Sequence, residues 1–378
     1  MYQPFTPPPR RLMGPGPTMV HPRVLAASAR PTIGHLDPAF AGLMDETKAL
    51  LQHAFRTGNA LTMPVSAPGS AGMEMCFVNL VEPGDKVIVC VNGVFGGRMK
   101  ENVERSGGVA VVVEDPWGAP VDPAKVAEAL DRHPDTKVVA FVHAETSTGA
   151  LSDARVITDL AHRQGALVIV DAVTSLAGVP LLVDEWQLDA VYSGSQKCLS
   201  CMPGLSPVTF GAAALEKIRS RGSRVQSWFL DLSLVMGYWD SAGGRSYHHT
   251  APVNAIYALH EALVMLHEEG LENAWQRHRD CHERLVKGLQ DLGLEMLVEE
   301  SARLPQLNAV RIPEGVDDAG LRRELLAKHD LEIGAGLGEL SGKIWRIGLM
   351  GEAARPENVD YCLAALKSVL GNQLTAAA

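Results

Sequence analysis

Strand-like and helix-like segments alternate along the first half of the chain, and this alternation limits the fold more than any other feature of the sequence. Short apolar runs typical of buried strands are separated by stretches with the 3.6-residue period of helices. We expect strands at 61–66, 86–91, 109–114, 137–142, 166–170 and 190–192. Repeated strand–helix–strand units predict parallel strands joined by right-handed crossovers. The predicted fold class is therefore α/β, with a large domain whose mostly parallel sheet is sandwiched by helices.

The length of the chain, 378 residues, suggests more than one domain. Residues 1–20 are rich in proline and glycine, and we expect them to form an extended N-terminal arm. The alternating pattern extends over 21–269 and gives the large domain. Gly270 interrupts it, and the remaining segment, 270–378, predicts a smaller C-terminal α+β domain. Within that domain we expect helices at 271–292, 317–329 and 356–370, and strands near 294–298, 308–312 and 343–348.

The charge and cysteine content exclude several classes of partner. The formal net charge is −10 and no run of five basic residues occurs, which argues against nucleic acid and anionic membranes as partners. No apolar run approaches the roughly 18 residues of a membrane span, and the N-terminus lacks a signal-type apolar segment. Six scattered cysteines do not form a disulfide framework. We therefore expect a cytoplasmic protein that acts on small molecules.

The segment 166–199 carries the first chemical signal. Asp171 ends one expected strand, and Lys197 lies just beyond the next. Ligands bind at the carboxyl ends of strands in α/β sheets. A lysine can attach the aldehyde of pyridoxal phosphate (PLP), and a carboxylate can keep the pyridine nitrogen of PLP protonated. An ordinary salt bridge at the sheet edge is the alternative interpretation.

A small-residue turn at 67–72 lies between an expected strand and an expected helix. Free backbone N–H groups and the helix dipole at such a turn bind anions. The turn lacks the GxxxxGK[ST] pattern of nucleotide-binding loops, so a monophosphate fits better than a triphosphate. The alternative is a plain helix cap with Ser70 near the N-cap position.

Other polar and aromatic residues follow the strand ends. Phe95, Thr146 and Gln196 are expected to converge with Asp171 and Lys197 at one edge of the sheet. Each residue alone is more typical of core packing or a cap. Arg346 alternates with Trp345 and Ile347 in an expected strand, so it faces the opposite side and could bind a carboxylate. A surface ion pair is the alternative for Arg346.

Three further patterns point to weaker hypotheses. Cys198 and Cys201 form a CxxC directly after Lys197, which allows a redox or metal role, although plain thiols near a pocket are favoured. His248 and His249 could contribute to a metal site, but no third ligand lies at a suitable spacing. The aromatic segment 227–244 is expected to be loop-like; irregular core is favoured for its aromatic residues, and a subunit interface or a pocket wall is the alternative. No metal is therefore predicted.

Ten blocks of the chain, taken together and in order, resemble the class V, fold-type I, PLP-dependent aminotransferases. The resemblance covers nearly the whole chain and is strongest to the alanine–glyoxylate and serine–pyruvate aminotransferase branch. The blocks are GPGPT (14–18), IGH (33–35), EPGD (82–85), NGVFGG (92–97), STG (147–149), VDAV (170–173), YSGSQK (192–197), YHHT (247–250), GLEN (270–273) and RIG (346–348).

The resemblance implies roles for individual residues. Lys197 would attach the cofactor and act as general base, and Asp171 would pair with the pyridine nitrogen. Val173 and Phe95 would pack on opposite faces of the ring, with Thr146 beside it. Gly69, Ser70, Ala71 and Gln196 would hold the phosphate, while Tyr247 and Thr250 would reach the phosphate in the neighbouring subunit of a homodimer. Arg346 and position 15 of the first block would bind the substrate.

The implied reaction moves an amino group from alanine or serine to glyoxylate or pyruvate, in ping-pong fashion through pyridoxamine phosphate. Other donors, 2-aminoethylphosphonate and ureidoglycine, stay open, and pyridoxamine–pyruvate transamination is more remote. A cysteine desulfurase would need a cysteine within 331–343, which has none. A non-catalytic PLP-binding module is the alternative from a different class, and an NAD-binding fold lacks its glycine fingerprint.

Overall fold

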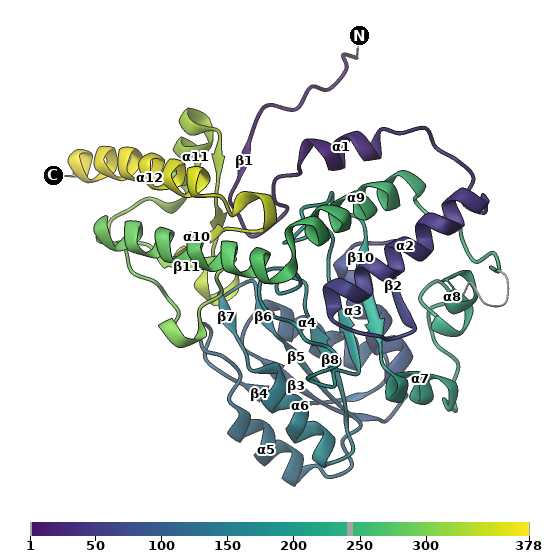
Figure 1. The fold of residues 1–378 in the computed structure, drawn as a ribbon. Helices are drawn as coiled ribbons and strands as arrows, with labels where there is room; N and C mark the ends of the chain where they lie inside the picture. Colours follow the sequence, from purple (N-terminus) through teal and green to yellow (C-terminus); the bar gives the residue numbers. More distant parts are fainter. Residues whose placement is uncertain (1, 240–244, 378) are drawn as a thin grey trace.

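The computed structural model describes residues 2–239 and 245–377, and a seven-stranded sheet forms its centre (Figure 1). The strand order is β2–β10–β9–β8–β5–β3–β4. Strand β10 is antiparallel to both of its neighbours, and the other adjacent pairs are parallel. The strands are β2 (Leu61–Val65), β3 (Lys86–Val91), β4 (Val109–Glu114), β5 (Val138–Val142), β8 (Leu167–Asp171), β9 (Ala190–Tyr192) and β10 (Ser206–Phe210). The predicted α/β class with a mostly parallel sheet is confirmed.

Helices cover this sheet on both faces. The chain steps outward from β3 to β4 through α4 and returns from β4 to β5 through α5, so right-handed crossovers place these two helices on opposite faces. Helices α1, α2 and α9 lie side by side near the β2–β10 end of the sheet (Figure 1). The helices up to this point are α1 (Pro22–Ser28), α2 (Pro38–Phe55), α3 (Gly69–Leu80), α4 (Val94–Arg105), α5 (Pro123–Arg132), α6 (Ala154–Arg163), α7 (Ala212–Arg219), α8 (Leu232–Trp239) and α9 (Val253–Glu269).

The C-terminal part is built on a three-stranded antiparallel sheet, in the order β11–β14–β13. Short strand β1 of the N-terminal arm pairs in parallel with β12, and β6 forms a small hairpin with β7. The remaining elements are β1 (Arg11–Leu12), β6 (Ala144–Glu145), β7 (Ala150–Leu151), α10 (Leu271–Asp291), β11 (Leu307–Arg311), α11 (Asp318–His329), β12 (Leu331–Glu332), β13 (Gly334–Ala335), β14 (Ile344–Gly348) and α12 (Pro356–Ala377).

Two separate hydrophobic cores support the division of the chain that the sequence predicts. The larger core lies around the seven-stranded sheet, and the smaller core lies among α10, α11, α12 and the second sheet. Met13 of the arm belongs to the smaller core. The boundaries 1–20, 21–269 and 270–378 stay a proposal, which these cores favour.

Two local expectations are wrong. The segment 227–244 is not only loop, because α8 occupies part of it; the apolar sequence of α8 lacks the amphipathic period that marks a surface helix. Residues 240–244 of that segment lie outside the described residues. The expected strand at 294–298 is reduced to one bridge between Met296 and Val310.

The order of the strands explains where a site can form. Strands β9, β8, β5 and β3 are consecutive neighbours and run in parallel, so their carboxyl ends meet at one edge of the sheet. Strand β2 points the same way, because both β2 and β9 are antiparallel to β10. Searched over its described residues, the chain has no helix with both the length and the apolar character to cross a bilayer.

Candidate active site

Asp171 ends β8 as a buried carboxyl group with two hydrogen-bond donors. Its Oδ1 accepts from the backbone N–H of Val173 at 2.8 Å, and its Oδ2 accepts from the Tyr192 hydroxyl at 2.8 Å. Burial raises the pKa of Asp171 to about 6, although these hydrogen bonds and the charge of Lys197 act in the opposite direction. Each carboxylate oxygen has room for a further donor. Asp171 can therefore accept a third hydrogen bond from a ligand.

Lys197 lies in the turn after β9, and its side chain is only 8% exposed. Its Nζ donates to the backbone carbonyl of Pro15 in the N-terminal arm. Burial, with a smaller contribution from the positive charge of Arg346, lowers the pKa of Lys197 to about 8. Lys197 and Asp171 are close enough for each charge to shift the pKa of the other. A buried amine with a lowered pKa is the form of lysine that attacks a carbonyl carbon.

The N-terminal arm closes over Lys197. A side chain at Gly16 would place its Cβ 2.6 Å from Lys197 Nζ, and the φ of +108° at this residue also requires glycine. Thr18 anchors the arm, because its N–H donates to the carbonyl of Gln196 at 3.1 Å. Position 15, which was expected to bind the substrate, is a proline, so its backbone offers a carbonyl and no N–H donor. That carbonyl accepts from Lys197 Nζ, and the close approach of the backbone to the lysine side chain occurs at Gly16.

The small-residue turn leads directly into α3, with Pro68 at the N-cap. The proline makes no side-chain cap, and Ser70 lies two residues after it, inside the first helical turn. The N–H groups of a first helical turn have no intrahelical partners. Gly69 lies against the loop after β9, because a Cβ there would meet Ser193 O and Val173 Cγ2 at 3.4 Å each. The turn thus brings Gly69, Ser70 and Ala71 to the same edge as Asp171.

Gln196 completes this corner of the site. Its Oε1 is buried and has no hydrogen-bond partner among the described residues. It approaches Gly194, where an added Cβ would lie 2.8 Å from that oxygen. A buried, unsatisfied amide is costly unless a ligand supplies the missing contact.

Phe95 and Thr146 extend the site from the ends of β3 and β5. Phe95 lies in the first turn of α4, and the guanidinium of Arg98 lies 4.9 Å from the centre of its ring. Thr146 is buried, and its hydroxyl hydrogen-bonds to that of Thr174, just beyond Asp171. Strand β5 adjoins β8 and β3 is the next strand in the sheet, so both residues lie at the same edge as Asp171, as the sequence predicted.

Arg346 reaches the site from the second sheet. Trp345 and Ile347 on either side belong to the smaller core, and Arg346 faces the opposite side, as its alternation predicted. Its Nε donates to Ala335 O at 2.7 Å and its Nη1 to Thr146 O at 3.2 Å. Burial lowers the pKa of Arg346 to about 10. No ion pair of this arginine is found in the part of the chain that the structure describes, so it is a buried cation with room for a carboxylate.

Tyr247 and Thr250 are both exposed and do not point into the site of their own chain. The segment between them is nevertheless tied to the small-residue turn, because His249 Nε2 lies 2.7 Å from Ser66 Oγ. The structure therefore brings together Asp171, Lys197, Val173, Gly69, Ser70, Ala71, Gln196, Phe95, Thr146 and Arg346, and leaves Tyr247 and Thr250 on the surface.

Sequence reasoning missed the groups that support these residues. Tyr192 ends the strand beside Asp171, but its hydrogen bond depends on the pairing register of β8 and β9. Glu145 and Ser147 flank Thr146 within a polar strand end, and only their spacing around Thr146 could have drawn attention to them. The Pro15 carbonyl carries no side-chain signal at all.

The residues of the site fit PLP. Asp171 offers a free acceptor position for a protonated ring nitrogen, and Lys197 offers a buried amine for the aldehyde. The first turn of α3 and the unsatisfied Gln196 amide lie where a phosphate would bind.

The CxxC motif has no comparable signature. Cys198 and Cys201 are free and buried, and burial raises the pKa of each thiol to about 12. Thiols with such pKa values are poor nucleophiles, in agreement with plain thiols beside a pocket. Among the described residues, no group of three or more histidine, cysteine or acidic side chains is arranged to hold a metal ion.

Comparisons with known proteins agree with this geometry. The family model for class-V aminotransferases matches residues 21–341. The alanine–glyoxylate aminotransferase of Oryctolagus cuniculus is 40% identical, over 98% of this chain and 95% of that protein. The (S)-ureidoglycine–glyoxylate transaminase of Bacillus subtilis is 37% identical, over 96% of this chain and 90% of that protein. A crystal structure of an alanine–glyoxylate aminotransferase from Nostoc sp. superposes with a TM-score of 0.96 at 46% identity, covering 98% of this chain and 97% of that one.

Proposed function

The chain belongs to the class-V aminotransferases, which depend on PLP, and on that premise we propose that it transfers the amino group of L-alanine or L-serine to glyoxylate or pyruvate. The observation that carries this proposal is the meeting of Lys197, Asp171 and Arg346 at one edge of the sheet. Glyoxylate stands in the names of both relatives compared above, which favours it as the acceptor.

Bound PLP supplies an electron-withdrawing ring that makes the substrate Cα–H acidic. Lys197 and Asp171 would hold the reactive end and the ring nitrogen, and Val173 and Phe95 would pack on the two faces. The first turn of α3 and Gln196 would hold the phosphate. Asp171 would keep a proton on the ring nitrogen, because its buried carboxylate stabilises a positive charge next to it.

The remaining residues bind and activate the substrate. Arg346 binds the α-carboxylate, which donor and acceptor share, so one clamp serves both half-reactions. Lys197 Nζ acts as the base that removes the proton from the substrate Cα, and as an acid it would deliver that proton to the carbon that carried the cofactor aldehyde, which is what separates transamination from racemisation. Its lowered pKa of about 8 favours this exchange near neutral pH. Burial of the site keeps water away from the charged groups and strengthens their interactions.

Ureidoglycine is a second candidate donor, because the Bacillus subtilis relative with that name matches this chain over nearly its full length. Transfer from 2-aminoethylphosphonate has no comparable support and stays a prediction. The expected cytoplasmic location and a role in glycine formation also stay predictions.

We also propose that the enzyme is a homodimer with shared sites. Trp228 is 63% exposed and stacks on His248, and Tyr247 is 64% exposed. Exposed aromatic side chains of this size are typical of protein interfaces. A groove lined by Ser70, Val94 and Arg98 opens beside the small-residue turn. Tyr247 and Thr250 of a second subunit would reach the phosphate through this groove.

The test is a product assay with purified holoenzyme. L-alanine and glyoxylate are expected to yield pyruvate and glycine, and L-serine, ureidoglycine and 2-aminoethylphosphonate are compared as donors at equal concentration. In the Arg346→Gln variant we expect KM to rise about 10- to 100-fold for donor and acceptor alike, because each loses a charge-assisted hydrogen bond. If only ureidoglycine is turned over, the donor is ureidoglycine and not alanine or serine. If the KM values of the variant are unchanged, Arg346 does not bind the substrate.

A further inference from the structure

Among the described residues, Glu145 is a buried acid close to Asp171 and Arg346 to which the roles proposed above give no task. It ends β6 and is 0% exposed. Its Oε1 accepts from the N–H and the hydroxyl of Ser147, at 3.0 and 2.6 Å, and its Oε2 accepts from the N–H of Phe95 at 3.2 Å. A buried carboxylate is costly unless several donors satisfy it. These three donors come from two segments that are far apart in the sequence.

Glu145 and Ser147 together hold the beginning of α4. The N-cap of α4 is Gly93, which has no side chain to cap the helix. In its place, Ser147 Oγ accepts from Val94 N at 3.0 Å while Glu145 accepts from Phe95 N. An added Cβ at Gly93 would lie 2.4 Å from Glu145 Cδ, so glycine is required for this close approach. The first two N–H groups of α4 are therefore fixed by the segment that follows β5.

The same segment fixes Arg346. The carbonyl of Thr146, between Glu145 and Ser147, accepts from Arg346 Nη1 at 3.2 Å. Burial lowers the pKa of Arg346 and raises that of Glu145 to about 7; the Glu145 carboxylate, when ionised, partly offsets the lowering at Arg346. Three consecutive residues, 145–147, thus connect the ring-stacking residue to the carboxylate-binding residue.

We propose that Glu145 is a positioning residue that sets the Phe95 ring and the Arg346 guanidinium relative to each other, so that the cofactor face and the substrate carboxylate site keep one fixed geometry. This inference rests on the proposed function. Glu145 acts through Phe95 N–H and through the charge it presents to Arg346, and it is not assigned a proton-transfer step.

The test compares Glu145→Gln with wild-type holoenzyme. The carboxamide keeps the shape of the side chain but replaces one acceptor oxygen by an NH2 donor. That donor must face either Phe95 N–H or the donors of Ser147, so at least one hydrogen bond is lost. We expect KM for donor and acceptor to rise about tenfold, the effect of one hydrogen bond to a charged group. We also expect a changed visible circular dichroism signal of the bound cofactor, since its asymmetric stacking on Phe95 shifts.

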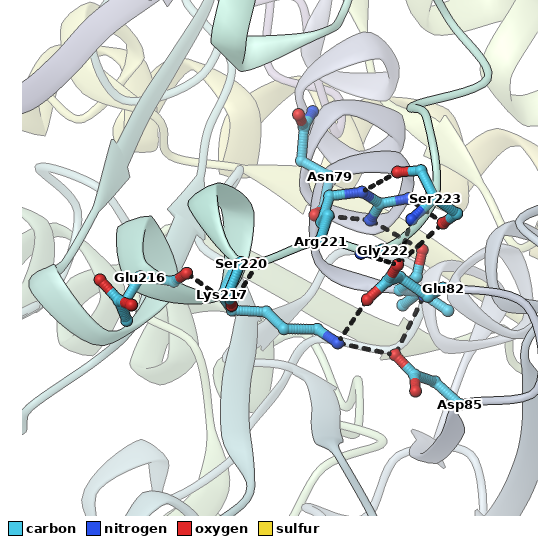
Figure 2. A network of polar contacts seen from close by, with 10 residues as sticks. Asn79, Glu82, Asp85, Glu216, Lys217, Ser220, Arg221, Gly222 and Ser223 are labelled. Carbon is cyan, nitrogen blue, oxygen red and sulfur yellow. Dashed lines mark hydrogen bonds and ion pairs between the residues drawn. The ribbon is translucent and has the colours of Figure 1, made fainter.

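Glu82 supplies a matched control away from the site (Figure 2). Its Oε1 accepts from Gly222 N, Ser223 N and Ser223 Oγ at 2.8 to 2.9 Å, a donor set similar to that of Glu145, and its Oε2 accepts from Lys217. Glu82→Gln is expected to lower the melting temperature and to leave both KM values and the dichroism signal unchanged.

Two further variants keep the proposal testable if Glu145→Gln does not fold. Glu145→Asp keeps both acceptor oxygens and is expected to give a smaller rise in KM. Ser147→Ala removes the acceptor for Val94 N–H, and its effect on KM is expected to be less than additive with that of Glu145→Gln. Wild-type KM values and an unchanged dichroism signal in these variants would overturn the proposal. If the proposed function is wrong, the wild-type enzyme will be inactive with these substrates. The dichroism signal of its bound cofactor can still be compared with that of the variants, so the role of Glu145 is tested separately.

Discussion

Burial, more than any single partner, sets the protonation of the ionisable groups in the site. It raises the pKa of Asp171 to about 6, lowers that of Lys197 to about 8 and lowers that of Arg346 to about 10. The two bases shift toward neutrality because each must lose hydration to reach the site. The chemistry of the site therefore depends on how well the arm and the two cores keep water away from Lys197.

The lowered pKa of Lys197 predicts how the cofactor-free enzyme captures PLP. Only the neutral amine attacks the aldehyde, so the rate of capture should rise with pH and level off above a midpoint near 8. The rise of the visible band after mixing cofactor-free enzyme with PLP, measured from pH 6 to about 11, gives this midpoint. A midpoint near 10.5, the value of an ordinary lysine, would contradict the burial of Lys197.

Site residues that lie at the ends of strands, or at alternating positions within a strand, were the ones that the sequence could predict. Asp171 and Lys197 follow adjacent parallel strands, and Arg346 lies in a strand with clear alternation, so the pattern predicted where they lie. Their roles were implied by the resemblance and stay predictions. The supporting roles of Tyr192 and Glu145 were not predicted, because their hydrogen-bond partners depend on strand register and on contacts between distant segments. The contacts of Pro15 and Gly16 with Lys197 could not be predicted for a similar reason, since a contact made by the backbone depends little on residue type.

At the scale of elements, the position of α3 decides where the proposed phosphate site lies. The helix packs closely on β9 and β10 because Gly72 leaves room for Ser206, whose hydroxyl donates to Ser193 O at 2.7 Å. A Cβ at Gly72 would lie 2.0 Å from that hydroxyl and 3.2 Å from Tyr192 Cβ. The position of the helix, and with it the first-turn N–H groups, therefore depends on this one glycine.

Gly72→Ala is accordingly expected to destabilise the enzyme by about 1–3 kcal/mol, the usual effect of overpacking a buried position, and to weaken PLP retention. Gly42→Ala is the matched control: this glycine is exposed within α2 and nothing lies within 4 Å of the added Cβ. The control should gain about 0.5–1 kcal/mol through helix propensity. Denaturant unfolding and equilibrium dialysis of PLP measure both effects. Equal stability of the two variants would show that α3 can shift to accommodate the added methyl group without a loss of folding free energy.

Elements were predictable where the hydrophobic period was regular. Helix α10 follows it closely, and the strands of the central sheet were recognised as short, continuous apolar runs. Helix α8 is apolar on nearly all sides and therefore gives no period to detect, and the 294–298 region has apolar residues but only a single bridge to β11.

At the scale of the whole molecule, strand order and the second subunit are the features that sequence pattern constrains least. The insertion of antiparallel β10 between β2 and β9 depends on tertiary packing, which no local period encodes. The resemblance implied a homodimer, and the exposed Trp228 and Tyr247 favour it, because an isolated chain would leave both rings in water.

Subunit mixing tests the proposed sharing of sites. A mixed dimer of Lys197→Ala and Tyr247→Phe subunits contains one site with an intact Lys197. If Tyr247 serves the partner's site, that same site also receives an intact Tyr247, and its PLP affinity should return to the wild-type value. If Tyr247 serves its own site, no site in the mixed dimer is intact and affinity should match that of the Tyr247→Phe homodimer. PLP retention on co-expressed, differentially tagged dimers distinguishes the two results.

The central claim, that Lys197 and Asp171 hold PLP for transamination, is tested most directly by the visible absorption spectrum of the purified enzyme. A yellow band should be present, bleach on addition of L-alanine and return on addition of glyoxylate, and Lys197→Ala should lack the band of lysine-bound cofactor. A band that is unaffected by alanine but bleached by another donor would support the mechanism and identify a different substrate. The absence of any band after PLP is added to the wild-type enzyme would contradict the claim.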